Sequence, residues 1–182
     1  EDILNNPGKE YHFTRAEADD IIRSSKLHDL GKIAIPDNVL LKPGRLTDDE
    51  FKLIKAHTIN GQQFLDHFIQ ESEDSFLQTA RDIAHFHHEH WDGSGYPGVR
   101  KGKDIPLSAR IVAIADVYDA LVSARPYKQA FSHEKSIQII VEGGNTHFDP
   151  YLVKVFERHA DEVSHVVAQP PNSLPGQPLG LL

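Results

Sequence analysis

Apolar residues recur at spacings of three and four along most of this 182-residue chain, and that periodicity most constrains its fold. Such spacing is typical of amphipathic α-helices. Two helix starts carry a capping-box signature, in which Thr14 precedes Glu17 and Thr47 precedes Glu50 by three residues. The pattern predicts six helices, over residues 15–27, 51–68, 76–90, 108–121, 132–141 and from 150 onward.

The loops between these segments are rich in proline and glycine, and no strand is predicted apart from one short pair within the glycine-rich stretch 91–106. The fold class that follows is all-α. A chain of this length suits one domain with a sizeable core. We expect that domain to occupy residues 1–168, followed by a proline- and glycine-rich tail, 169–182, that is extended or disordered.

The composition excludes several classes of protein. The net charge of −8 argues against the broad basic surface of a nonspecific DNA-binding protein. The absence of cysteine excludes disulfides and thiolate metal sites and suits a cytoplasmic location. No apolar run approaches the roughly 20 residues of a membrane-spanning helix. Twelve histidines are the anomaly, because neutral imidazole is the commonest metal ligand.

Four of the histidines fall within the run "HFHHEH", from His85 to His90. The run is either a polar surface segment or half of a metal site. If it continues the helix over 76–90, His85 shares a face with His88 and His87 shares a face with His90, so the four side chains cannot all reach one ion. The adjacent His87 and His88 could bind neighbouring ions of one cluster.

Candidate ligands also occur elsewhere in the chain. His28 and Asp29 are adjacent in "KLHDLGK", where the alternative is a polar pair at a helix end that Gly31 terminates. His57 lies on the apolar face of its helix, where a histidine is commonly a hydrogen-bonded core residue. Asp116 lies in the apolar run "RIVAIADVYDAL", and a carboxylate there is costly to bury unless it is paired or binds metal.

Together these residues form a His/Asp ligand set drawn from four helices, which suits iron or manganese better than a structural zinc site. Two metal ions about 3.5–4 Å apart can clamp a phosphodiester and activate a water for in-line attack. Lys32, three residues after Asp29, could hold a phosphate oxygen or assist the leaving group. Bound cations would also supply the local positive charge that an acidic chain needs to bind a phosphate ester.

Several long motifs in one order resemble the HD-GYP family, the bacterial cyclic di-GMP phosphodiesterases of the HD phosphohydrolase superfamily. The motifs are "LHDLGKIAIPDNVLLKPGRLT", "HHEHWDGSGYP", "IPLSARIVAIADVYDALVSARPYK" and "GGNTHFDP", and the match runs from about residue 11 to about residue 163. The resemblance implies a helical bundle that holds two or three divalent metal ions. It also implies hydrolysis of cyclic di-GMP to pGpG and often onward to GMP.

The resemblance assigns roles residue by residue. It implies metal ligands at His28, Asp29, His57, His87, His88 and Asp116, and it leaves His85 and His90 as polar residues flanking the site. Asp29 and Lys32 become the catalytic pair, and Arg125 and Lys128 become contacts for phosphate and guanine. The family's GYP motif falls on Gly95-Tyr96-Pro97. This loop is expected to contact substrate through Tyr96 or to contact diguanylate cyclase (GGDEF) domains.

One feature of the family pattern is not matched. Family members usually take a further histidine, and in trinuclear members a glutamate, from a helix upstream of the HD doublet, and only 27 residues precede His28 here. We therefore expect this chain, which lacks methionine, to be a piece of a longer protein with an N-terminal regulatory domain. Two alternatives stay open, a non-catalytic cyclic di-GMP sensor or GYP-loop interaction module, and a phosphohydrolase acting on another cyclic dinucleotide.

Overall fold

The structure, a computed structural model, describes residues 11, 14–69, 74–124 and 129–168. These residues form the predicted all-α fold. The described part contains no strand, so the short strand pair expected within 91–106 is wrong. The elements in chain order are α1 (Arg15–Ser24), η1 (Ser25–Leu27), η2 (Leu30–Ala34), α2 (Asp37–Leu40), α3 (Asp48–Lys55), α4 (His57–Ile69), α5 (Ser75–Phe86), η3 (Gly102–Asp104), α6 (Leu107–Val122), α7 (His133–Glu142), α8 (Pro150–Arg158) and α9 (Ala160–Ala168), where η marks a 3-10 helix.

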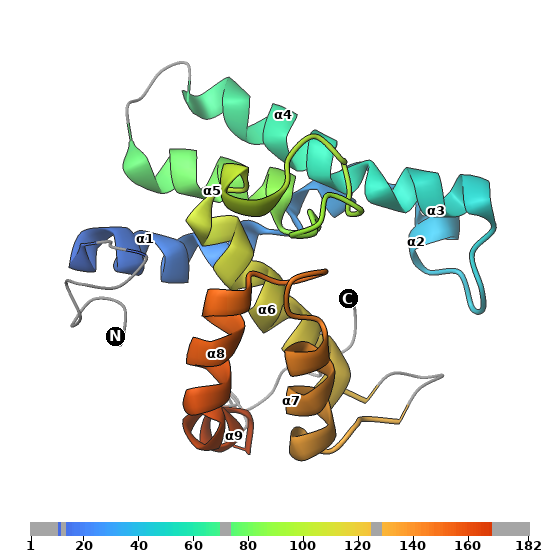
Figure 1. Cartoon of the computed structure of the whole chain (residues 1–182). Coiled ribbons are helices and arrows are strands. Elements are labelled where there is room, and N and C mark those ends of the chain that lie inside the picture. The colour runs from blue at the N-terminus through green and yellow to red at the C-terminus, as the bar shows by residue number, and fades with distance from the viewer. Residues whose placement is uncertain (1–10, 12–13, 70–73, 125–128, 169–182) are drawn as a thin grey trace, which may run out of the picture.

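Helix α5 organises the first half of the molecule by packing against α1 and α4, while η2 packs against α4 (Figure 1). Leu65 of α4 and Ala80 and Ala84 of α5 form the buried contact between these two helices. Small alanine side chains let the helices approach closely. The C-terminal end of α5 is thereby held beside the start of α4, which is where the candidate histidines lie.

Helix α6 carries the larger core of the second half. It packs against α7 and α8 and also contacts α5, so it links the two halves (Figure 1). Buried residues from several segments meet here, namely Tyr11, Ile114, Tyr118, Leu121, Ile140, Phe148, Leu152 and Val153. Burying side chains of this size contributes about 1.5–3 kcal/mol each, so this half provides a stable base for the first.

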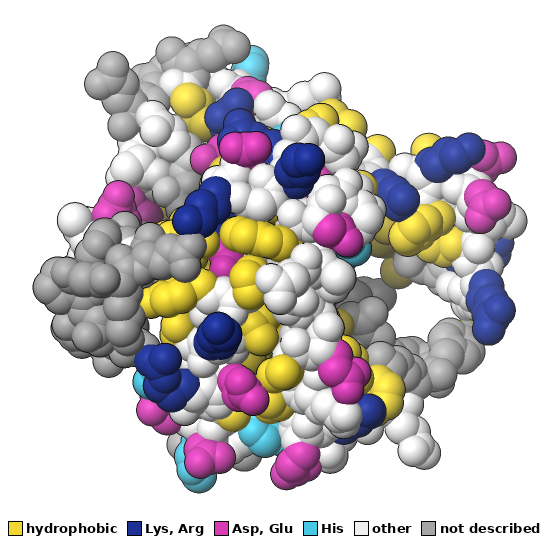
Figure 2. Space-filling view, viewed as in Figure 1, with side chains coloured by type: hydrophobic (Ala, Val, Ile, Leu, Met, Phe, Trp, Pro, Cys, Tyr) yellow, Lys and Arg dark blue, Asp and Glu magenta, His cyan; other side chains and the backbone are white. Residues whose placement is uncertain are grey.

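Both predicted capping boxes are present, at the starts of α1 and α3. The single helix expected over 51–68 is instead broken at Ala56, so that α3 ends at Lys55 and α4 begins at His57. The apolar spacing continues across this break, and periodicity alone therefore does not reveal it. Helices α2 and α3 form an arm that stands away from the body, and Figure 2 shows both basic and hydrophobic side chains on it.

The helix expected over 76–90 ends earlier, at Phe86, and His87 is its C-terminal cap. His88 and His90 consequently lie in the turn that follows rather than on a helix face. The helix expected over 15–27 also tightens after Ser24 into the 3-10 helix η1. In the part of the chain that the structure describes, no helix is both long and apolar enough to cross a membrane.

Gly31 does not terminate a helix as expected, because it lies within η2. A Cβ atom at this position would lie 1.9 Å from the carbonyl oxygen of His57. Only glycine permits such a close backbone contact. The contact holds η2, and Asp29 immediately before it, against the first turn of α4.

Candidate metal centre

Four of the predicted ligands converge on one point. Asp29 lies between η1 and η2, His57 is the first residue of α4, and His87 and His88 follow the last turn of α5. One ligand atom from each lies within 4.8 Å of all the others. Residues separated by up to 59 positions in sequence therefore form a single cluster.

Backbone carbonyls orient the imidazoles of this cluster. In three histidines Nδ1 lies within hydrogen-bond distance of a carbonyl oxygen of the preceding turn, and because a carbonyl only accepts, Nδ1 must carry the proton. The pairs are His28 with Ser25 at 2.7 Å, His57 with Ile54 at 2.6 Å and His87 with Ile83 at 2.9 Å. In each neutral ring Nε2 is then an unprotonated acceptor. Hydrogen bonds of this kind fix the ring orientation and tautomer of metal-binding histidines.

The acceptor atoms in the cluster face one another. Nε2 of His57 lies 3.5 Å from Nε2 of His87 and 3.4 Å from Oδ1 of Asp29. This Oδ1 atom is buried and has no hydrogen-bond partner within the described part of the chain. Facing lone pairs repel unless a cation or a proton lies between them. The residues therefore fit a divalent metal ion, which would satisfy all three acceptors at once.

The electrostatic environment keeps these groups in their ligand forms. Burial, reinforced by the neighbouring imidazoles, lowers the pKa of His87 to about 3 and that of His88 to about 2. Burial would raise the pKa of Asp29, but its interactions with the His28 ring and with the Lys32 ammonium outweigh it and hold that pKa far below its usual range. The Lys32 ammonium lies 2.5 Å from Oδ2 of Asp29. Neutral imidazoles and an ionised carboxylate are the forms that bind metal.

His28 and Asp116 lie on the outer side of the cluster. Nε2 of His28 lies 3.3 Å from Oδ2 of Asp29 and 3.7 Å from Oδ1 of Asp116. The apolar flanks of Asp116 suggested burial, yet its side chain is 29% exposed and lies beside His28. The six predicted ligands thus lie as a close group of four, in which only His57 and His87 are fully buried, with a half-buried pair adjoining it.

The GYP loop lies against the same cluster. The Tyr96 ring centroid is 4.6 Å from that of His88, and the Tyr96 N–H donates to the His88 carbonyl at 3.0 Å. Gly95 makes this approach possible, since a Cβ there would lie 2.4 Å from the same carbonyl oxygen. Tyr96 is therefore next to the ligand candidates, whereas Arg125 and Lys128 lie outside the described residues.

Sequence reasoning missed Glu89, which anchors the far side of this loop. Its side chain is buried, and Oε1 accepts the N–H groups of Gly98, Val99 and Arg100 at 2.7–3.1 Å. The signal was present, because a lone acidic residue inside the histidine run is unusual. The histidines around it also suit a metal site, and that pattern does not indicate a role for Glu89.

The remaining histidines of the run do not pair as helical faces predict. His85 packs on Phe86, and its Nδ1 lies 3.4 Å from the Thr58 carbonyl. The His90 ring lies 3.9 Å from that of His147, a residue the sequence did not single out. The expected pairing of His87 with His90 is wrong because the helix ends before both. Neither His85 nor His90 belongs to the four-residue cluster.

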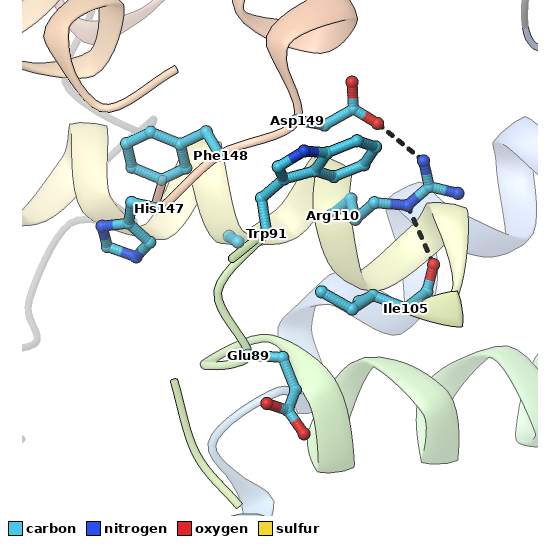
Figure 3. Close-up of a pocket in the computed structure, with 8 residues that line it drawn as sticks. Glu89, Trp91, Ile105, Arg110, His147, Phe148 and Asp149 are labelled. Carbon is cyan, nitrogen blue, oxygen red and sulfur yellow. Dashed lines mark hydrogen bonds and ion pairs between the residues drawn. The ribbon is translucent and has the colours of Figure 1, made fainter. Parts of the chain in front are cut away.

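Behind the metal centre lies a second buried polar cluster, centred on Arg110 of α6. Its guanidinium donates to the Ile105 carbonyl at 2.8 Å, the Tyr11 hydroxyl at 2.7 Å and Oδ2 of Asp149 at 2.6 Å. Figure 3 shows Arg110 reaching toward Asp149 beside the Trp91 ring, at a small cavity. This cluster ties the base of the GYP loop to the start of α8.

The model of the HD domain family matches residues 2–152 of the chain. The chain belongs to the HD domain family. A cyclic di-GMP phosphodiesterase of Vibrio cholerae is 54% identical over 147 residues, covering 79% of this chain and 30% of that protein. One of Thermotoga maritima is 43% identical over 143 residues, covering 79% and 38%. These similarities are consistent with the HD-GYP branch that the motifs indicate.

Relatives with a different named substrate also match. The 3'3'-cGAMP-specific phosphodiesterase 2 of Vibrio cholerae is 42% identical over 162 residues, covering 89% of this chain and 30% of that protein. A crystal structure of a cyclic GMP-AMP specific phosphodiesterase of Vibrio cholerae superposes with a TM-score of 0.58 at 22% identity, covering 92% of this chain and 47% of that one, and shows the shared fold. The chain spans roughly a third of the length of the curated relatives it matches.

Proposed function

We propose that this domain is a metal-dependent phosphodiesterase that hydrolyses cyclic di-GMP to pGpG, GMP or both in bacterial second-messenger signalling. The main support is that Asp29, His57 and His87 converge, with the unprotonated Nε2 atoms of both histidines turned toward a carboxylate oxygen of Asp29. A cluster built this way would be unstable without a cation. The similarity to cyclic di-GMP phosphodiesterases supports the choice of substrate.

The proposed site holds two or three divalent ions. The group of Asp29, His57, His87 and His88 would bind one side, and His28 and Asp116 would bind the adjoining side. Iron or manganese suits these nitrogen and oxygen donors. When bound, such ions polarise the phosphodiester and activate water for in-line attack.

The protein's own residues contribute binding and charge to this reaction. Asp29 stays ionised because its pKa is held low, and it fixes the Lys32 ammonium beside the ligands. Lys32 would stabilise a phosphate oxygen or the departing oxygen. Tyr96 would contact the substrate from the loop side, and Arg125 and Lys128 remain predicted contacts for phosphate and guanine.

The deciding experiment uses the full-length protein, loaded with iron or manganese and incubated with cyclic di-GMP. We expect pGpG or GMP as product, and we expect His28→Ala and Asp116→Ala to abolish turnover and lower the bound metal. Asp119→Ala is the matched control, since Asp119 is exposed on the same helix. A metal-replete wild-type protein that yields no product would contradict the proposal.

A second substrate, 3'3'-cGAMP, is supported by the similarity to phosphodiesterases named for it. Both dinucleotides carry the same phosphodiester linkages and differ only in a base, so the metal centre cannot distinguish them. Competition between the two substrates in one assay would rank them by kcat/KM. Tight binding without turnover of either would favour the alternative of a nucleotide sensor.

The GYP loop and the rest of the full-length protein supply the proposed partners. We expect Gly95-Tyr96-Pro97 to be available to GGDEF-domain proteins, and we expect an N-terminal regulatory domain to control the site. Pull-down of a GGDEF domain by wild-type protein and by Tyr96→Ala tests the first expectation. Equal capture by both would contradict it.

A further inference from the structure

A lysine that sequence reasoning did not single out lies at the edge of the metal centre. Lys55 is the last residue of α3, two positions before His57. Its ammonium nitrogen lies 4.8 Å from the ring centroid of Phe51 and 5.2 Å from that of Tyr96. Because the Tyr96 ring packs on His88, one aromatic ring separates Lys55 from a candidate metal ligand.

Unlike the lysines near it, Lys55 forms no ion pair with a carboxylate in the described part of the chain. The nearby lysines each lie against a carboxylate, Lys32 against Asp29, Lys42 against Glu50 and Lys52 against Asp49. Within the described part of the chain, no carboxylate lies at ion-pair distance from Lys55. A cation held by ring faces alone keeps its hydrogen-bond donors available for an anion.

The surroundings of Lys55 open toward solvent. Phe51 is 46% exposed, although it packs against the lysine. The two rings restrict the flexible lysine stem, so less conformational entropy is lost when the ammonium binds an anion. The chain has a net charge of −8, and such local positive points are what an anionic substrate requires.

We propose that Lys55, held between Phe51 and Tyr96, binds the phosphate group of a cyclic dinucleotide that is not being cleaved. The proposal rests on the proposed function, in which the metal centre and Lys32 take the scissile phosphate. A cyclic dinucleotide has two phosphodiester groups on opposite sides of its ring. Binding one group at the metals leaves the other as an anion, and Lys55 on the far side of Tyr96 offers it a cation.

The test replaces Lys55 in the metal-loaded protein and follows kcat and KM separately. Lys55→Met keeps an apolar stem and removes the charge, whereas Lys55→Arg keeps the charge. Lys52→Met is the matched control, because Lys52 is exposed on the same helix and paired with Asp49. Losing one charged hydrogen bond to phosphate should raise KM for cyclic di-GMP about tenfold. We expect kcat and metal content to stay near wild type, Lys55→Arg to recover most of the change and Lys52→Met to have no effect.

The outcomes separate this proposal from the one it rests on. An unchanged KM in Lys55→Met, a fall in kcat alone, or an equal effect of Lys52→Met would overturn the role of Lys55 while leaving the phosphodiesterase intact. If wild type binds cyclic di-GMP without turnover, the phosphodiesterase fails, and the dissociation constants of the same variants decide the role of Lys55 by calorimetry. A wild type that neither binds nor cleaves it overturns both.

Discussion

The described part of the chain contains a paired polar cluster around Arg110 and the cluster of the metal centre, and they differ in how completely their groups are paired. The Arg110 guanidinium meets a carbonyl, a hydroxyl and the Asp149 carboxylate. In the metal centre, unprotonated nitrogens of His57 and His87 face an oxygen of Asp29 that lacks a hydrogen bond in the described structure. A cluster whose polar groups are all hydrogen-bonded stabilises the folded state. A cluster with unsatisfied acceptors can still bind a ligand such as a cation. The Arg110 cluster is therefore assigned a structural role and the cluster around His57 a binding role, because their polar groups differ in hydrogen bonding more than in residue type.

The largest expected effect breaks the unpaired cluster. Asp29→Ala should reduce kcat at least about a thousandfold, since a metal site contributes several kcal/mol to transition-state stabilisation. Bound metal measured by elemental analysis should fall in parallel. The melting temperature of the metal-free protein should fall only slightly, because the loss of the half-exposed ion pair with Lys32 is offset by removal of an unsatisfied buried oxygen. A large loss of stability in the metal-free state would mean that the cluster is structural.

The opposite response is expected from the paired cluster. Asp149→Ala should lower the free energy of unfolding by about 3–5 kcal/mol, because it leaves Arg110 buried without its counter-charge. It also removes the side-chain cap that accepts the N–H groups of Tyr151 and Leu152 at the start of α8. Denaturant unfolding measures the loss. Normal stability with reduced metal content would reverse the roles assigned to the two clusters.

Glu89 connects the two clusters through the GYP loop. Glu89→Ala removes the acceptor of three backbone N–H groups, and leaving them unsatisfied should cost about 1–3 kcal/mol locally. Amide hydrogen exchange at Gly98, Val99 and Arg100 should accelerate. Glu89→Gln retains an acceptor oxygen and should exchange at an intermediate rate. Equal protection in both variants and wild type would show that the loop is held by other contacts.

The smallest expected effect is a pH dependence near the paired cluster. Burial, with a smaller contribution from His90, lowers the pKa of His147 to about 4, while Asp92 opposes the shift. Between this value and the ordinary one near 6.5, the unfolded chain binds more protons, so stability should fall as the pH is lowered through this window. His147→Phe keeps the ring stack and should flatten that fall. Unfolding curves with identical pH slopes would contradict this assignment.

The sequence predicted the elements better than their ends. Residue spacing is insensitive to the break at Ala56 because the apolar face continues from α3 into α4. It is equally insensitive to the end of α5 at Phe86, because histidines suit a helix and a turn alike. Both ends are decided by tertiary contacts, such as the fit of Gly31 against the His57 carbonyl.

The candidate ligands were named from motifs, while their arrangement came from the fold. No spacing rule distinguishes the close group around His57 from the adjoining His28 and Asp116, because the distances between ligand atoms depend on how α4, α5 and α6 meet. Glu89 and Lys55 were missed for a related reason. Their partners, backbone amides and aromatic rings, are identified only when distant segments are in contact.

The position of Trp91 gives the protein an optical signal of its own. It is the sole tryptophan, it follows His88 by three residues, and its indole lies 5.9 Å from the Arg110 guanidinium. The backbone N–H of Trp91 donates to the His147 carbonyl. A fluorophore beside one cluster and three residues along the chain from the other should respond to a change in either one. Its emission can therefore follow metal uptake at one side and loosening at the other without any added label.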